Sequence, residues 1–242
     1  ECLHATSMER RNGFDEQIHY PEVAGSFLSP ERWQAVLESV IRRLDKADSS
    51  GPAAEPVSRH GSTTHISVVD SRGMAVSVTT SNGEGSGIVV PGTGIHLNNM
   101  LGEEDINPMG FHGLSGGATL PSMMAPSMFL RQDRPLLVLG SGGSNRLRAA
   151  IVQVLLRHIM FGEDIEIAVH APRLHNEDHV LDVEPERLSA RERQQLLDLG
   201  WEIRDWQQPS VYFGGVHAIS ISEKGQMQGA GDPRRGGCVA WA

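Results

Sequence analysis

Two adjacent threonines, Thr63 and Thr64, stand where a segment rich in serine, proline, glycine and alanine gives way to a β-prone run. A threonine hydroxyl is a weak nucleophile at neutral pH and needs a base to accept its proton. One solution makes threonine the first residue of a chain, so that its own α-amino group is the base. Cleavage before Thr63 would create that group, and an exposed linker over 47–62 would tolerate cleavage. The alternative is that both threonines only open a strand.

A second group of residues, Gly140-Ser141-Gly142-Gly143-Ser144, lies between a strand predicted over 136–139 and a helix predicted over 146–160. Consecutive glycines let backbone N–H groups point into one concavity beside a helix N-terminus, which binds an anion or a developing oxyanion. No Gly-Lys-Ser/Thr follows, and Asn145 replaces the third glycine of the dinucleotide pattern, so neither nucleotide motif fits. A tight strand-to-helix turn is the other interpretation.

A third group is acidic. Glu103, Glu104 and Asp105 are consecutive in a loop rich in glycine and asparagine over 81–118. Because adjacent carboxylates repel one another, we expect at least one to have a cationic partner, either a substrate ammonium group or a calcium ion. A solvated acidic loop is the alternative.

Other functional classes find little support. The formal net charge of −9 argues against a nucleic-acid partner, because phosphate binding needs a basic surface. His170, His175 and His179 match no metal motif, so we predict a surface loop there and no metal site. No feature of the sequence calls for a cofactor.

The elements expected to position these groups alternate between helix and strand. Apolar residues recur at helical spacing over 29–46, where Ser29 is the expected cap and Pro30 the first helical residue. Strands are predicted over 65–70 and 74–79.

The second half of the chain repeats this alternation. Ser189 and Glu192 form a capping box that begins a second helix, and 216–222 is a further strand. Together these patterns predict helices layered on sheets, an α+β fold.

Five runs of residues together resemble the γ-glutamyltransferase (γ-glutamyltranspeptidase) family. They begin with the run 63–70, which resembles the start of the small subunit, and continue in family order through 94–99, 140–144, 171–175 and 229–234. Residues 1–62 resemble the tail of the large subunit with its pre-cleavage linker, and 63–242 the small-subunit catalytic region.

The resemblance implies a four-layer αββα fold of the N-terminal-nucleophile hydrolase type, incomplete in this chain. It also implies autocleavage of the Ser62–Thr63 bond. Thr63 would then attack a γ-glutamyl amide, with its freed α-amine as general base. The Gly142 and Gly143 N–H groups would hold the oxyanion, and the glutamyl group would pass to water or to an amino-acid or peptide amine.

Four further roles follow from the resemblance. Ser81 falls where a hydroxyl bonds the nucleophile, Asn82 and Glu103 fall at substrate-binding positions, and Ser122 falls where hydroxyls contact the substrate carboxylate. Met100 and Met123 depart from the family pattern, which leaves open a related amide hydrolase of the polyglutamate-cleaving or acylase type.

The family's large subunit is mostly absent before Glu1. We therefore expect a fragment, or one chain of a split enzyme, that requires the missing segment. A non-catalytic fragment or subunit is the alternative. The resemblance points to the periplasm or the extracellular space.

Overall fold

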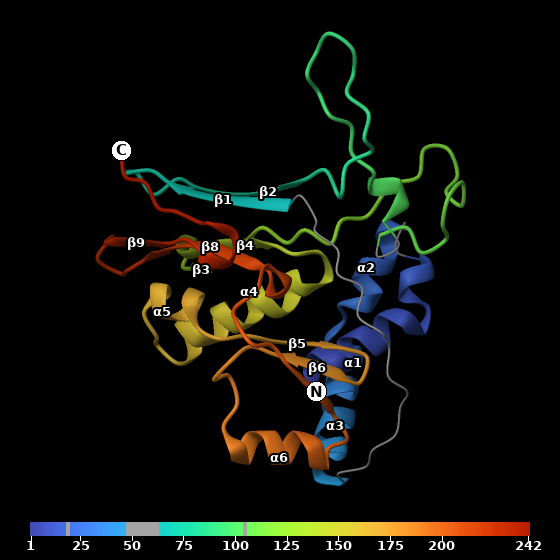
Figure 1. Ribbon diagram of the computed structural model, residues 1–242, viewed down its shortest axis with the longest axis vertical. Coiled ribbons are helices and arrows are strands. Elements are labelled where there is room, and N and C mark those ends of the chain that lie inside the picture. Colours follow the sequence, from blue (N-terminus) through green and yellow to red (C-terminus); the bar gives the residue numbers. More distant parts are fainter. Residues whose placement is uncertain (18–19, 47–62, 104–105) are drawn as a thin grey trace. The chain divides into compact units, whose positions relative to one another are not determined.

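The computed structural model describes residues 1–17, 20–46, 63–103 and 106–242 (Figure 1). The chain divides into two compact units. Unit 1 contains Glu1–Val57, Leu101–Pro121 and Asn176–Gln207, and unit 2 contains Ser58–Met100, Ser122–His175 and Gln208–Ala242. The predicted linker over 47–62 lies outside the described residues, and the predicted subunit boundary before Thr63 stays a prediction.

Unit 1 is mainly helical. Its helices are α1 (Cys2–Glu9), α2 (Pro21–Phe27), α3 (Pro30–Lys46) and α6 (Ala190–Asp198). A small sheet has the order β5-β6-β7. Its strands β6 (Val180–Val183) and β7 (Glu202–Asp205) belong to unit 1, and β5 (Leu174–Glu177) spans the point in the chain where unit 2 gives way to unit 1. β6 and β7 are parallel, and α6 connects them.

The two predicted helix caps, Ser29 and Ser189, are confirmed. α3 begins at Pro30, and the Ser29 hydroxyl accepts a hydrogen bond from the Arg32 N–H at 3.4 Å. α6 begins after Ser189, whose side chain and backbone both bond Glu192 as a capping box. Among the helices of the described residues, none combines the length and the apolar character needed to cross a membrane.

Unit 2 contains two antiparallel sheets. The first is the hairpin β1 (Thr63–Val69) and β2 (Ala75–Ser81), in which Thr63 pairs with Ser81. The second has the order β3-β4-β8-β9. Its strands are β3 (Ser127–Arg131), β4 (Arg134–Gly142), β8 (Gly215–Ile221) and β9 (Met227–Ala230), and its helices are α4 (Leu147–Leu155) and α5 (Ile165–His170).

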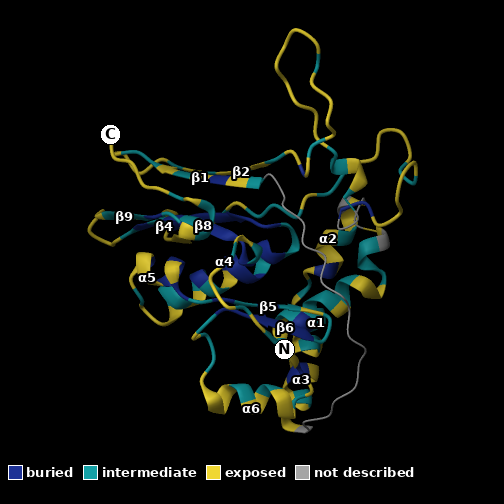
Figure 2. Cartoon of the chain, in the orientation of Figure 1, coloured by how far each residue is buried: buried dark blue, intermediate teal, exposed yellow. Residues whose placement is uncertain are grey.

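These elements form three layers. The hairpin lies over one face of the four-stranded sheet, and α4 and α5 pack on the other face (Figure 1). The core lies between the sheet and the helices, where β4 and β8 are dark blue in Figure 2. Leu137, Val216, Val154 and Ile165 are fully buried there. The predicted α+β class with stacked sheets is confirmed.

The hairpin turns its polar face inward. Ser67 Oγ donates to the carbonyl oxygens of Val138 and His217 at 3.3 Å each, and Ser77 Oγ donates to the Leu139 carbonyl at 3.1 Å. Four of the outward positions are instead aliphatic and 44–54% exposed: Ile66, Val68, Val76 and Val78. Within the described residues of unit 2, α4 and α5 pack on the four-stranded sheet, on the side away from the hairpin (Figure 1).

Two sequence predictions need correction. The run 140–144 was predicted as a loop, but β4 continues to Gly142 because Gly140, Ser141 and Gly142 pair with β8. Gly140 serves a close approach: a Cβ there would lie 2.3 Å from the His65 ring. The predicted histidine surface loop is wrong in part, because His175 is buried on β5.

Candidate active site

Two hydroxyl groups meet at the open end of the β1–β2 hairpin. Thr63 Oγ1 and Ser81 Oγ are 2.9 Å apart, because β1 and β2 pair these residues directly. Ser81 Oγ also accepts a hydrogen bond from the Gly83 N–H at 3.0 Å. With that lone pair occupied, the Ser81 hydroxyl proton is well placed to point at Thr63 Oγ1 and to stabilise negative charge on it.

The end of β4 lies against the first residue of β1. A Cβ on Gly142 would be 2.5 Å from the Thr63 carbonyl oxygen, so only glycine permits this approach. Gly143 follows with a φ of +136°, and Ser144 begins a short 3-10 turn that leads into α4. The backbone of the predicted oxyanion residues, Gly142 and Gly143, is thus close to the predicted nucleophile.

Asn82 directly follows Ser81 and is exposed. Its carbonyl oxygen accepts hydrogen bonds from the Gly85 and Asn99 N–H groups at 2.9 and 3.3 Å. Asn99 Oδ1 in turn accepts from the Glu84 N–H at 2.8 Å. These bonds close the base of the loop that projects beyond the hairpin and bring the Asn98-Asn99 pair back towards Thr63.

The structure does not test the two remaining predicted substrate residues, Ser122 and Glu103. Ser122 is exposed, and its Oγ accepts a hydrogen bond from the Met124 N–H at 3.1 Å. Glu103 belongs to unit 1, where its carbonyl accepts from the Ile106 and Asn107 N–H groups. Glu104 and Asp105 lie outside the described residues. The substrate roles of Ser122 and Glu103 stay predictions.

A buried histidine between the two sheets was missed by sequence reasoning. The His65 side chain is 3% exposed, and its Nδ1 and Nε2 atoms lie 2.7 Å from Thr79 Oγ1 and 3.0 Å from Ser67 Oγ. Burial, together with a smaller effect of the neighbouring His217, lowers the pKa of His65 to about 4. Thr63, His65 and Ser67 are alternate residues of a strand and so point to the same, inward side. This alternation was the signal in the sequence that could have identified His65 as buried.

This lowered pKa predicts acid sensitivity. Between about pH 6.5 and pH 4 the unfolded chain binds a proton at His65 that the folded protein excludes, so the free energy of unfolding falls as the pH falls. We expect His65→Gln to have a shallower loss of stability across this window. Urea unfolding at a series of pH values measures both slopes, and equal slopes would contradict the assignment.

A buried ion cluster supports the C-terminal segment behind β8. Arg173 Nη2 donates to Asp232 Oδ2 at 2.5 Å, and Arg234 Nη1 donates to Asp232 Oδ1 at 3.2 Å. The Val216 N–H also donates to Asp232, at 2.9 Å. Burial alone would raise the pKa of Asp232, but the two arginines and these N–H donors hold it below its ordinary value. From this anchored segment, Arg235 Nη1 donates to the Thr63 carbonyl at 3.2 Å.

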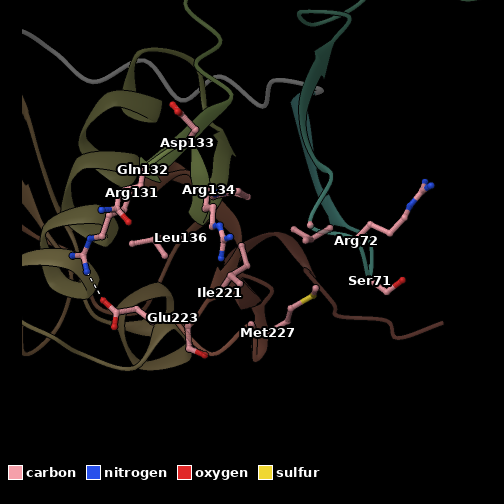
Figure 3. Close-up of a pocket in the computed structure, with 15 residues that line it drawn as sticks. Ser71, Arg72, Arg131, Gln132, Asp133, Arg134, Leu136, Ile221, Glu223 and Met227 are labelled. Carbon is pink, nitrogen blue, oxygen red and sulfur yellow. Dashed lines mark hydrogen bonds and ion pairs between the residues drawn. The ribbon is translucent and has the colours of Figure 1, made fainter.

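A pocket of about 810 Å³ lies at the opposite ends of the same strands (Figure 3). It is surrounded by the turns that follow β1, β3 and β8, and an ion pair of 2.6 Å joins Arg131 to Glu223 on its wall. None of the predicted site residues lines this pocket. The candidate site is therefore the hydroxyl and glycine cluster around Thr63.

Comparison with known proteins identifies relatives of similar sequence. The chain is 31% identical over 182 residues to a glutathione hydrolase proenzyme of Bacillus subtilis, covering 74% of this chain and 30% of the relative. It is 33% identical over 170 residues to the acylase ACY 1 proenzyme of a Pseudomonas species, covering 69% of this chain and 30% of the relative. The chain thus spans about a third of the length of these relatives.

A solved structure has the same fold. The γ-glutamyltranspeptidase from Pseudomonas nitroreducens, complexed with L-DON, superposes with a TM-score of 0.61 at 29% identity, covering 74% of this chain and 98% of that chain. The family model described as gamma-glutamyltranspeptidase matches residues 1–242. With the motifs in register and the fold in agreement, the chain belongs to the γ-glutamyltranspeptidase family.

Proposed function

We propose that this chain carries the catalytic half of an enzyme that transfers or hydrolyses γ-glutamyl groups through Thr63. The observation that supports this most directly is the 2.9 Å contact between Thr63 Oγ1 and Ser81 Oγ, beside the glycine end of β4. A nucleophile, a hydroxyl partner and backbone donors for an oxyanion are three of the groups that acyl transfer needs, and the freed α-amine of Thr63 would supply the base.

In the proposed reaction, cleavage of the Ser62–Thr63 bond frees the Thr63 α-amine. The amine accepts the proton of Thr63 Oγ1 while that oxygen bonds to the carbonyl carbon of a γ-glutamyl amide. The amide C–N bond then breaks, and the leaving amine takes the proton from the Thr63 ammonium group. Water or an amine acceptor attacks the resulting ester and regenerates the hydroxyl, with the Gly142 and Gly143 N–H groups stabilising both tetrahedral intermediates.

Intact mass spectrometry after long incubation at neutral pH tests this proposal. The expected result is two pieces, the second with Thr63 as its first residue. A chain that stays uncut in the presence of the complete large-subunit region would contradict it.

An amide hydrolase of acylase type is the second candidate. The acylase relative is as similar to this chain as the glutathione hydrolase, and Met100 and Met123 replace polar residues of the commoner family pattern. Rates with a γ-glutamyl anilide and with an acyl amide, measured on the same preparation, separate the two. A ratio that favours the acyl amide would support the second candidate.

We also propose that the outward face of the hairpin packs against a large-subunit region of the kind that the longer relatives contain. Ile66, Val68, Val76 and Val78 form an aliphatic strip there, and soluble proteins rarely leave such a sheet face uncovered. Co-expression with that region should therefore restore cleavage if the isolated chain is inactive. Val68→Lys is expected to prevent this rescue.

A further inference from the structure

The side chain of Arg235 lies where three backbone segments meet. Its Nη1 donates to the Thr63 carbonyl oxygen at 3.2 Å. Its aliphatic part packs on Gly215, where a Cβ would lie 2.5 Å from Arg235 Cδ, and its Cζ would be 3.3 Å from a Cβ on Gly142. The two glycines thus make room for a guanidinium group between the nucleophile and the end of β4.

A buried ion cluster fixes the segment that carries this guanidinium group. Arg235 ends the short turn Pro233–Arg235, whose cap is the buried Asp232, and Asp232 itself is fixed by Arg173 and Arg234. The Arg235 Nε atom is buried and has no hydrogen-bond partner among the described residues. Burial lowers the pKa of Arg235, Arg146 lowers it further and Asp232 opposes both, yet an arginine stays charged in a protein. A fixed positive charge therefore lies beside Thr63.

The other charged and titratable groups of the described residues leave this charge dominant. β1 is packed by β2, β4 and β8. The charged or titratable side chains on these strands are His65, Arg134 and His217, and Asp70 directly follows β1. Arg146 and Asp232 act on Arg235, and Glu84 is an exposed residue of the loop that follows β2.

Each of the others is remote, neutral or compensated. Asp70 and Arg134 lie at the far end of the hairpin and of β4. Burial lowers the pKa of His65 and of His217, so both are neutral at pH 7. The charge of Asp232 is balanced by two other arginines, and Arg146 adds to the positive side.

We propose that Arg235 is a positioning residue for the nucleophile: it holds the first residue of the mature chain by its carbonyl group and keeps the adjacent α-amine unprotonated by its charge. This inference rests on the proposed N-terminal-threonine mechanism and adds to it a source for the basic form of the amine.

The chemical need for such a group is clear. An ordinary α-amino group has a pKa of about 7.7–8.0, so at pH 7 most of it is protonated and unable to accept the Thr63 hydroxyl proton. The amine and the carbonyl belong to one residue, which places the guanidinium within about 7 Å of the amine. A like charge at that range disfavours protonation, and we expect the amine pKa to fall by about one unit.

The direct test titrates the amine. A protease site inserted before Thr63 in the full chain frees this amine whether or not the protein cleaves itself. The rate of acetylation at each pH, read from the mass of the Thr63 peptide, gives its pKa. We expect Arg235→Gln, which keeps a donor but removes the charge, to raise that pKa by about one unit. Arg235→Lys, which keeps the charge, should leave it within a few tenths of a unit. Arg72→Gln, at the far turn of the hairpin, is the matched control and should change nothing.

Activity gives a second readout. In the self-cleaved enzyme the acidic limb of the kcat/KM profile should move upward in Arg235→Gln by the same amount, with a loss of about 5- to 10-fold at pH 7 that is recovered at high pH. A purely structural role would lower the profile without moving the limb.

The outcomes separate the two proposals. An unchanged amine pKa in Arg235→Gln, or a pKa of 7.7 or above in the native protein, would overturn the role of Arg235. The native value needs no variant, so a poorly folded Arg235→Gln protein leaves the test intact. A shifted amine pKa in a protein that never turns over a γ-glutamyl amide would support Arg235 and refute the proposed function.

Discussion

Thr63→Ala is expected to leave the Ser62–Thr63 bond intact and to reduce γ-glutamyl transfer by about 10⁴-fold or more. The variant removes the atom that attacks in both reactions, and loss of a covalent nucleophile has effects of this size in other hydrolases. Intact mass spectrometry measures the cleavage, and release of the anilide measures turnover. Ser81→Ala should have a smaller effect, because it removes only the hydroxyl 2.9 Å from Thr63 Oγ1.

Thr64→Ala is the matched control. Thr64 is the next residue on the same strand, but its side chain points to the exposed side of the hairpin and pairs across to Thr80. We expect near-normal cleavage and turnover. Equal losses in both variants would show that the strand, and not the Thr63 hydroxyl, is what matters.

The largest expected effect on stability comes from Asp232→Asn. Asp232 is fully buried and balances Arg173 and Arg234, which are each about 2% exposed in their side chains. Asparagine keeps the shape but only one acceptor oxygen, and it leaves two buried guanidinium groups without a counter-charge. Breaking such a pair costs about 3–5 kcal/mol in the free energy of unfolding, which urea denaturation at pH 7 measures.

The pH dependence of this effect has a definite sign. Because the pKa of Asp232 is lowered in the folded state, its stabilisation is present above the ordinary carboxyl pKa and is lost as the pH falls through the folded pKa. Native and variant proteins should therefore converge in strongly acidic solution. Asp133→Asn, at an exposed turn with a φ of +60° that asparagine also adopts, is the control and should change stability little. A similar loss in both variants would contradict the buried-pair explanation.

Much of the local structure could be predicted from the sequence because each signal was itself local. The capping box at Ser189 and the period of α3 depend only on nearby residues, and both are confirmed. The end of β4 was mispredicted because glycine normally indicates a turn. Here Gly140 and Gly142 are required by close neighbours, the His65 ring and the Thr63 carbonyl, that are distant in sequence.

Only those contacts of the site that join residues close together in the sequence could be predicted. Thr63 and Ser81 come together because the β1–β2 hairpin pairs them. The two strands and the turn were predicted from local pattern, but the predicted strands stopped short of both residues, and Ser81 was assigned from the family resemblance. His65, Asp232 and Arg235 act through partners up to 172 residues away, and no local pattern records such contacts. Glu103 belongs to the other unit, and its place beside the substrate still rests on the family resemblance.

The β1–β2 hairpin turns its polar face inward and its aliphatic residues outward, and this arrangement has a consequence for how the protein reaches its native state. Taken alone, the hairpin would gain more by turning its valines and isoleucine inward, so local preference and native arrangement conflict at this point. A rotation of the hairpin to its other face would bury the aliphatic strip, but it would carry the Thr63 hydroxyl to the solvent side and leave the carbonyls of Val138, His217 and Leu139 without the serine donors. The hydrogen bonds of the inward serines therefore favour the arrangement in which this face of the hairpin packs on the four-stranded sheet. Thr63 lies on the same face of the hairpin as these serines.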